Sequence, residues 1–186
     1  MDTLPSVMAG QPAQTAALSA ADAQSMQQFL RFALGSERYA VRIDAVREIL
    51  EVSRMTPLPL MPAFVRGVMN LRGAVVPVID LGARLGLEPT AIGRRTCVVI
   101  VDIALADEQG AQRLGMLVDA VYEVVDSTQA ELEPVPRLGT RIDPGYIRSM
   151  VRVRGQATAE LDLANVLDQA ALAAMIAEHS NPGANH

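Results

Sequence analysis

Short stretches in which apolar and polar residues alternate recur along the chain, and they constrain its fold more than any other feature. Alternation with a period of two is typical of a strand that turns one face to a core and the other to solvent. The clearest case is a pair of stretches, residues 29–34 and 38–43, which Gly35-Ser36 connects. Two turn residues that include a glycine are enough to join antiparallel strands, so we predict a β-hairpin here.

Further strands are expected wherever apolar stretches end at turn-forming residues. They are residues 74–79, 96–103, 113–118, 147–153 and 157–161, with Val121, Val124 and Val125 continuing the pattern after the third. Pro77 cannot donate a backbone hydrogen bond, so it indicates an edge strand or a bulge. Many short strands with few helices predict a mainly β chain, built as small barrels or a sandwich.

A short helix is expected directly after the hairpin. Asp44 can cap its first turn, and the apolar residues around it have roughly helical spacing: Ile43, Val46, Ile49 and Leu50. Glu48 would then face solvent. Two more helices are expected, one over residues 81–85 with Asp80 as its cap and one over about 163–178.

The usual catalytic side chains are missing or badly placed. All 16 basic residues are arginine, which excludes mechanisms that need a lysine. Cys97 lies in an apolar strand and is interpreted as a core residue, while His179 and His186 fall near the C-terminal end. Asp119 and Glu123 lack any sign of a pocket that would separate their pKa values. We therefore expect no catalytic residue, no metal site and no cofactor.

The amino-acid composition also limits the kinds of partner that the chain could bind. A net charge of −5, with three Phe, three Tyr and no Trp, argues against a nucleic-acid-binding protein. A single cysteine excludes a disulfide framework and favours the cytoplasm. No signal peptide is recognisable at the start, and no apolar run approaches the roughly 18 residues that a membrane-spanning helix needs. Insertion into a membrane is therefore not expected.

Three motifs follow one another between residues 46 and 81. They are Val46-Arg47-Glu48-Ile49-Leu50, the segment Pro62–Gly73 with Gly67 and Asn70-Leu71-Arg72-Gly73, and Val75-Val76-Pro77-Val78-Ile79-Asp80-Leu81. In order and spacing they resemble the signature of CheW-like coupling proteins, which reads V-x-E-I, then P-x-x-x-x-G-x-x-N-L-R-G, then V-P-V-I-D-L. The second half agrees more loosely, through residues 115–119 and 161–163. The resemblance covers about residues 27–168.

The resemblance implies a mainly β fold of two small five-stranded SH3-like barrels that share a hydrophobic core, with short helices and a C-terminal helix. Residues 27–168 would form this domain, residues 1–26 a mobile N-terminal tail, and residues 169–186 the end of the C-terminal helix and a tail. It also implies a cytoplasmic adaptor without enzymatic activity, recruited to membrane-associated receptor arrays. Its partners would be the cytoplasmic tip of a methyl-accepting chemoreceptor and the regulatory domain of a CheA-type histidine kinase.

Carried over to this chain, the resemblance assigns two sets of partner-binding residues. The first set would form the groove that receives the receptor: Ile43, Val46 and Glu48, with Val99 and Val121 across from them. The second set is the turn that would support the receptor and kinase contacts: Gly67, Asn70, Leu71, Arg72 and Gly73.

The residues themselves leave alternatives open. A guanidinium in a turn can bind a carboxylate of a partner, but Arg72 could equally tie down its own turn by pairing with a nearby carboxylate. Glu48 could be a solvated helix charge. Val46, Val99 and Val121 could be plain core, because a groove floor and a core have the same apolar pattern.

The region 146–161 departs from the family pattern. Ser149 stands where a glycine is common, Glu160 interrupts the last strand, and an arginine stripe is formed by Arg148, Arg152 and Arg154. We expect Glu160 to pair with one of those arginines across the strands. The alternatives for function are an adaptor of a pilus-motility or surface-sensing (diguanylate cyclase) pathway, or a small-ligand-binding module.

Overall fold

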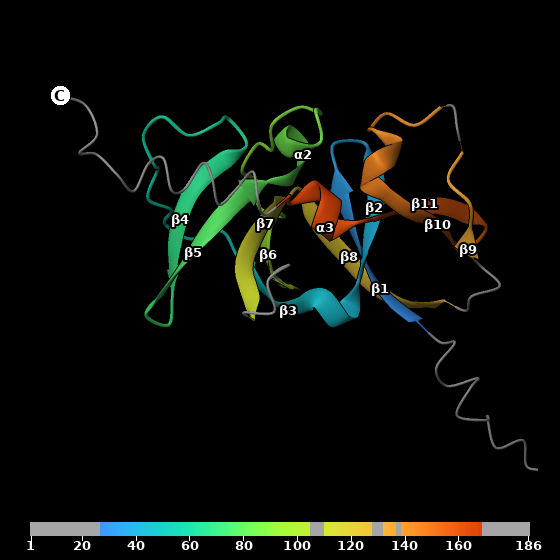
Figure 1. Cartoon of the computed structure of the whole chain (residues 1–186), viewed down its shortest axis with the longest axis horizontal. Helices are drawn as coiled ribbons and strands as arrows, with labels where there is room; N and C mark the ends of the chain where they lie inside the picture. The colour runs from blue at the N-terminus through green and yellow to red at the C-terminus, as the bar shows by residue number, and fades with distance from the viewer. Residues whose placement is uncertain (1–26, 105–109, 128–131, 137–138, 169–186) are drawn as a thin grey trace, which may run out of the picture.

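The structure, a computed structural model, describes residues 27–104, 110–127, 132–136 and 139–168. Within these residues the strands form two sheets that lie side by side, as Figure 1 shows. The six-stranded sheet has the order β8-β1-β2-β11-β10-β9, and the five-stranded sheet the order β3-β6-β7-β5-β4. Their bounds are β1 Gln27–Leu34, β2 Glu37–Arg42, β3 Val46–Glu51, β4 Val65–Leu71, β5 Ala74–Asp80, β6 Cys97–Ala104, β7 Ala111–Val118, β8 Ala120–Ser127, β9 Leu132–Glu133, β10 Ile147–Val153 and β11 Gln156–Leu161.

The expected fold class is confirmed. Helices in the described part are short: α2 (Leu81–Arg84), α3 (Leu163–Val166) and the 3-10 turns η1 (Ile43–Ala45) and η3 (Pro144–Tyr146). Each sheet has five long strands, since β9 contributes only two residues. No helix in this part of the chain is long and apolar enough to cross a bilayer. The helix predicted over about residues 163–178 is only partly present: α3 ends at Val166, Leu167 and Asp168 are not helical, and residues 169–178 lie outside the described residues.

One hydrophobic core lies between the two sheets. Phe32 of β1 and Met116 of β7 are both fully buried in it, so both sheets contribute their inner faces. Two smaller clusters lie apart from it, one around Val98 and Ile100 and the other around Phe29 and Val151. In β6 successive side chains point to different clusters, Val99 and Val101 to the shared core and Val98 and Ile100 to the smaller one, so both faces of this strand are buried.

The predicted hairpin of residues 29–43 is confirmed as β1 and β2, with Phe29 opposite Arg42 and Leu34 opposite Glu37. Gly35 in its turn has a φ of 60°. A left-handed conformation at this place suits a two-residue hairpin turn and is easiest for glycine.

The helix predicted over residues 43–50 is wrong. Only Ile43–Ala45 form a single 3-10 turn, and Val46–Glu51 form strand β3. This strand pairs antiparallel with β6, so that Ile49 lies opposite Val99. Val46 and Leu50, four residues apart, share one face in a helix and in a strand alike, and the ladder with β6 decides the outcome.

Of the two alternatives predicted for Pro77, an edge strand or a bulge, the edge strand is wrong, because β5 lies between β7 and β4. The parallel ladder with β7 covers only Val78, Ile79 and Asp80, so Pro77 lies just outside it. A register shift does occur one residue away, between Val65 and Gly67 of β4. The missing N–H of the proline therefore costs the ladder with β7 no hydrogen bond.

Asp80 caps α2, as expected, and does more. Its Oδ1 accepts a hydrogen bond of 3.2 Å from the Ala83 N–H, while the Thr90 N–H donates to its Oδ2 at 2.9 Å. The carboxylate is fully buried, and the Arg66 guanidinium lies 3.8 Å from it. Asp80 therefore fixes both the start of α2 and the loop that follows it.

The two sheets are joined by Asp119, the single residue between β7 and β8. Its backbone N–H donates to the Ala33 carbonyl at 3.1 Å, and its carboxylate accepts a 2.7 Å hydrogen bond from the Gly35 N–H. The chain therefore passes from one sheet to the other at a residue that is bonded to the β1–β2 hairpin.

Candidate partner-binding site

Arg72 and Glu48 form an ion pair on the surface of the five-stranded sheet. The Arg72 guanidinium donates one hydrogen bond to each carboxylate oxygen of Glu48, of 3.1 Å and 2.9 Å. The side chain of Arg72 is 76% exposed and that of Glu48 is 22% exposed. The pair thus joins one residue from each of the two predicted partner-binding sets.

A tight turn between β4 and β5 positions Arg72. Arg72 and Gly73 have φ values of 51° and 86°, and two left-handed residues in succession are typical of a type I′ hairpin turn. The Asn70 Oδ1 accepts a 2.9 Å hydrogen bond from the Gly73 N–H and so holds the turn. Leu71 packs against the core cluster beneath. The turn residues therefore fix the backbone from which Arg72 extends.

The ion pair spans the two edges of one sheet. β3 and β4 are the outer strands in the order β3-β6-β7-β5-β4, so their residues meet only because the sheet curls into a barrel. A second contact closes the same gap, through hydrogen bonds of 2.8 Å and 2.9 Å that Thr56 and Val68 exchange. Gly67 makes this contact possible, because a Cβ there would lie 2.3 Å from the Thr56 carbonyl oxygen.

The remaining predicted groove residues differ in how deeply they are buried. Ile43, Val46 and Val121 are partly buried and pack against the edge of the shared core, so each has some exposed surface. Val99 is fully buried between its cross-strand neighbours Ile49 and Met116. Val99 therefore supports the site from beneath and presents no surface of its own.

A charged network beside the pair was missed by the sequence analysis. Asp102 accepts hydrogen bonds from Arg47 at 2.6 Å and from Arg113 at 2.9 Å. The Arg113 hydrogen bond, helped by that of Arg47, holds the pKa of Asp102 below its ordinary value of 3.8. Asp102 in turn raises the pKa of Arg113, and the nearby charge of Glu48 adds to this.

The strand register explains this network. Asp102 of β6 lies directly opposite Arg113 of β7. Arg47 is the extra residue in β3 at the register shift between Val46 and Glu48, which turns it towards β6. Opposite charges on the two predicted strands 96–103 and 113–118 were the available signal for Asp102 and Arg113, whereas the contact of Arg47 requires residues 46–51 to be a strand.

An apolar groove of about 600 Å³ adjoins the network. Val68, Val75 and Pro77 line it from the β4–β5 hairpin, Met61 from the preceding loop, and Asp102 and Arg113 lie at its charged rim. Val75 is 67% exposed and Leu60, in the same loop as Met61, is 92% exposed. Exposed apolar side chains beside ordered charges are typical of protein interfaces.

Metal sites and catalytic sites are most often formed by the side chains of His, Cys, Asp and Glu. In the parts of the chain that the structure describes, no group of three or more His, Cys, Asp or Glu side chains could hold a metal ion. Cys97 is partly buried, packs against the core and lies with its Sγ 3.2 Å from the Arg95 carbonyl oxygen. His179 and His186 lie outside the described residues.

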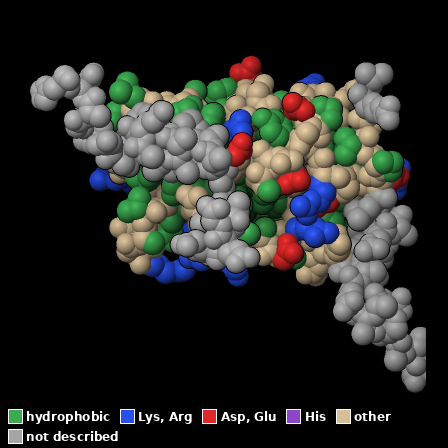
Figure 2. All heavy atoms as spheres, in the orientation of Figure 1, with side chains coloured by type: hydrophobic (Ala, Val, Ile, Leu, Met, Phe, Trp, Pro, Cys, Tyr) green, Lys and Arg blue, Asp and Glu red, His purple; other side chains and the backbone are tan. Residues whose placement is uncertain are grey.

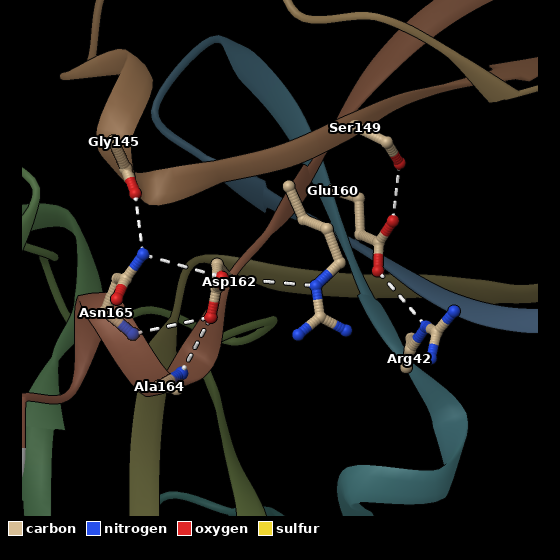
Figure 3. A network of polar contacts seen from close by, with 8 residues as sticks. Arg42, Gly145, Ser149, Glu160, Asp162, Ala164 and Asn165 are labelled. Carbon is tan, nitrogen blue, oxygen red and sulfur yellow. Dashed lines mark hydrogen bonds and ion pairs between the residues drawn. The ribbon is translucent and has the colours of Figure 1, made fainter.

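The prediction that Glu160 pairs with the arginine stripe is wrong. Glu160 is buried and lies opposite Ser149, whose hydroxyl donates a 2.5 Å hydrogen bond to its Oε2 (Figure 3). The guanidinium near it is that of Arg42 on β2, 3.3 Å from Oε1. Arg148, Arg152 and Arg154 extend from the exposed face of β10 and its turn, and they pair with Asp162, Glu133 and Glu123.

The surface agrees with this pattern of pairing. At the centre and right of the face shown in Figure 2, acidic and basic side chains lie next to one another. The arginine stripe is therefore largely neutralised by its own chain and does not form a basic patch.

The chain is similar in sequence to a protein family and to several of its members over most of the described residues. The family model of the CheW-like domain matches residues 28–171. "Chemotaxis protein CheW" of Rhizobium meliloti (strain 1021) is 30% identical over 140 residues, which are 75% of this chain and 86% of that protein. "Protein FrzA" of Myxococcus xanthus is 31% identical over 140 residues, 75% of this chain and 83% of that protein.

A solved structure agrees in fold. The crystal structure of the scaffolding protein TtCheW from Thermoanaerobacter tengcongensis superposes with a TM-score of 0.66 at 30% sequence identity. The match covers 74% of this chain and 89% of that one.

Proposed function

Since the chain belongs to the CheW-like domain family, whose members are non-catalytic scaffolds of chemotaxis, we propose that it couples chemoreceptors to a histidine kinase. The receptor contact would be the cytoplasmic signalling tip of a methyl-accepting chemoreceptor. The kinase contact would be the regulatory domain of a CheA-type kinase. The protein would then be recruited to membrane-associated receptor arrays through the receptor.

The observation that carries this proposal is the ion pair between Arg72 and Glu48. It connects the turn assigned to receptor and kinase contacts with the strand assigned to the receptor groove. An exposed ion pair contributes only about 0–1 kcal/mol to stability, so little free energy opposes its rearrangement when a partner binds. Both charges are therefore available for partner contacts without loss of the fold.

The surroundings of the pair supply the other contacts that an adaptor needs. Ile43, Val46 and Val121 expose part of their apolar surface at the edge of the shared core. An amphipathic helix, such as one arm of a receptor hairpin, binds through apolar side chains of this kind. The groove beside Val75, with Arg113 at its rim, offers a second surface of the same character.

The proposal concerns the coupling role and not one motility system, because relatives named CheW and FrzA are about equally similar to this chain. An adaptor of a pilus-motility or surface-sensing pathway would use the same residues.

The decisive experiment measures binding of the full chain to two purified partners, a receptor signalling-tip fragment and a CheA regulatory domain. Isothermal titration should give a dissociation constant in the micromolar range for each, as expected for small transient interfaces. A ternary mixture should elute as one complex in size-exclusion chromatography. If neither partner binds the folded protein, the proposed coupling role is wrong.

A further inference from the structure

Two arginines share one tyrosine ring on the outer surface. The guanidinium carbon of Arg38 lies 4.8 Å from the centre of the Tyr122 ring, and that of Arg95 lies 5.2 Å from it. The three residues come from β2, β8 and the loop before β6, so the cluster draws on both sheets. Tyr122 itself is 40% exposed.

A β-bulge gives Tyr122 this orientation. In the ladder between β1 and β8, Arg31 lies opposite Glu123 and the next residue, Phe32, lies opposite Val121. Tyr122 is the extra residue between them and has no partner on β1. Bulges often re-aim a side chain next to a functional site, and this one turns a large aromatic ring to the surface.

Among the described residues, no ion pair joins Arg38 or Arg95 to a carboxylate. The acidic residues beside Arg38 and Tyr122 in the sequence are engaged elsewhere: Glu37 with Arg141, Glu123 with Arg31 and Arg154, and Asp119 with the Gly35 N–H. Two positive charges held near one ring repel each other, and a carboxylate that pairs with either guanidinium lowers that repulsion.

Arg84 shows what a purely structural arrangement looks like in the same molecule. Its guanidinium lies 5.2 Å from the Phe64 ring and 5.5 Å from the Tyr146 ring, and its Nε donates to the Val166 carbonyl at 2.8 Å. Here one cation is held by two rings and a backbone acceptor, so its charge is accommodated. At Tyr122 the numbers of cations and rings are reversed, because two exposed guanidinium groups lie near a single ring.

We propose that Arg38, Arg95 and Tyr122 form a recognition site for carboxylate side chains of an acidic polypeptide segment in a partner protein. The guanidinium groups bind carboxylates through charge-assisted hydrogen bonds, and contact with the ring helps to hold each group in place. Val124, two residues further on the same strand and 48% exposed, offers an apolar contact beside them.

The charge of the whole chain favours a short acidic segment over an extended polyanion. A net charge of −5 repels nucleic acid and anionic membranes at long range, while two local arginines attract a few carboxylates at close range. This site lies outside both residue sets of the proposed coupling function, so its test does not depend on that function.

The test titrates the full-length protein with a short capped peptide of alternating Glu and Ala around one central Leu. A matched peptide has Gln in place of every Glu, and sodium phosphate at equal ionic strength is the third arm. The readout is the NMR shift of the arginine Nε–H groups and of the backbone amides of residues 122–124. The acidic peptide should shift the signals of Arg38 and Arg95, and neither the Gln peptide nor phosphate should do so at the same concentration.

Variants assign the effect to the site. The double variant Arg38→Gln/Arg95→Gln should weaken binding of the acidic peptide by roughly 2- to 30-fold, since each exposed ion pair contributes about 0.2–1 kcal/mol. The control Arg54→Gln/Arg148→Gln removes the same charge elsewhere and should bind like the wild type. Tyr122→Phe should keep the affinity and Tyr122→Ala should lower it.

Several results would overturn the proposal. Equal binding of the Glu and Gln peptides would exclude carboxylate recognition, and equal losses in the two double variants would reduce the effect to net charge. Phosphate binding as tight as that of the peptide would exclude an acidic polypeptide as the intended occupant. Should Tyr122→Ala fail to fold, the two single arginine variants, whose side chains are exposed, still decide the outcome.

Discussion

Arg72 and Glu48 lie 24 residues apart in the chain, on opposite edges of one sheet, and meet through two hydrogen bonds where that sheet closes into a barrel. The side chain of Arg72 is largely exposed to solvent, and that of Glu48 is largely covered by the protein. A partner that reaches Arg72 therefore also reaches the seam of the barrel.

Reversing the charge of Arg72 tests the pair directly. Arg72→Glu places two carboxylates together and should weaken binding of the receptor tip or the kinase domain at least 5-fold. The protein should stay folded, because removal of an exposed ion pair changes the free energy of unfolding by about 1 kcal/mol or less. Titration calorimetry and urea unfolding measure the two effects separately.

Arg152→Glu is the matched control, since Arg152 forms a similar exposed pair with Glu133 on the other sheet. It should bind both partners normally. The charge swap Arg72→Glu/Glu48→Arg restores the pair, and recovery of binding by the swap would mean that the pair acts only on local structure.

Gly67→Ala should destabilise the protein far more than Gly73→Ala. At Gly67 the φ is 139° and a Cβ would collide with the Thr56 backbone, whereas at Gly73 the φ is 86° and nothing lies within 4 Å. The second variant carries only conformational strain of about 1 kcal/mol, and the first should lose at least about 3 kcal/mol by strain and overlap together. Equal urea midpoints for the two variants would refute the close approach of Thr56.

Removing Arg42 should be more harmful than neutralising Glu160. The side chain of Glu160 is 2% exposed and that of Arg42 is 35% exposed. In Arg42→Met the buried carboxylate loses its cation, while in Glu160→Gln the arginine can turn to solvent and the amide can still bond to Ser149. We expect losses of about 3 kcal/mol and about 1 kcal/mol respectively, measured as free energies of unfolding. The reverse order would show that the buried charge is compensated elsewhere.

The stability of the barrel should depend on pH through Asp102. Its pKa is lowered in the folded protein by Arg113 and Arg47, so the unfolded chain binds a proton more readily. The stabilisation is therefore present above the ordinary value of 3.8 and is lost as the pH falls through the lowered value. Thermal unfolding of Asp102→Asn should show a deficit against the wild type at pH 7 that shrinks in acid.

Asp44→Asn serves as the control for this profile, since Asp44 is exposed and has no ion pair within the described part of the chain. A deficit of Asp102→Asn that stays constant down to pH 2 would point to lost packing and would contradict a role of the charge.

Most strands could be predicted from the sequence because alternating apolar residues, or a short apolar run that ends at turn residues, mark them locally. The hairpin at Gly35 and the cap at Asp80 each depend on a few neighbouring residues, and both were found. Strand β3 was missed because its apolar spacing also fits a helix, and only the ladder with β6 excludes one. Local patterns cannot contain that ladder.

The site was harder to predict for the same reason. Val99 lies in the core, and its sequence environment is identical to that of a groove floor. The contact between Arg72 and Glu48 depends on closure of the barrel, and the partner of Glu160 comes from β2, far away in the chain. Tyr122 became visible as a candidate only through the bulge that separates Val121 from Glu123.

Asp119 affects how far the two barrels can move relative to each other. One residue separates β7 from β8, and its backbone and carboxylate are both bonded to the β1–β2 hairpin. A junction of one residue, bonded in this way, restricts rotation of one barrel relative to the other. Two partners bound one to each barrel would therefore be held in a defined relative orientation.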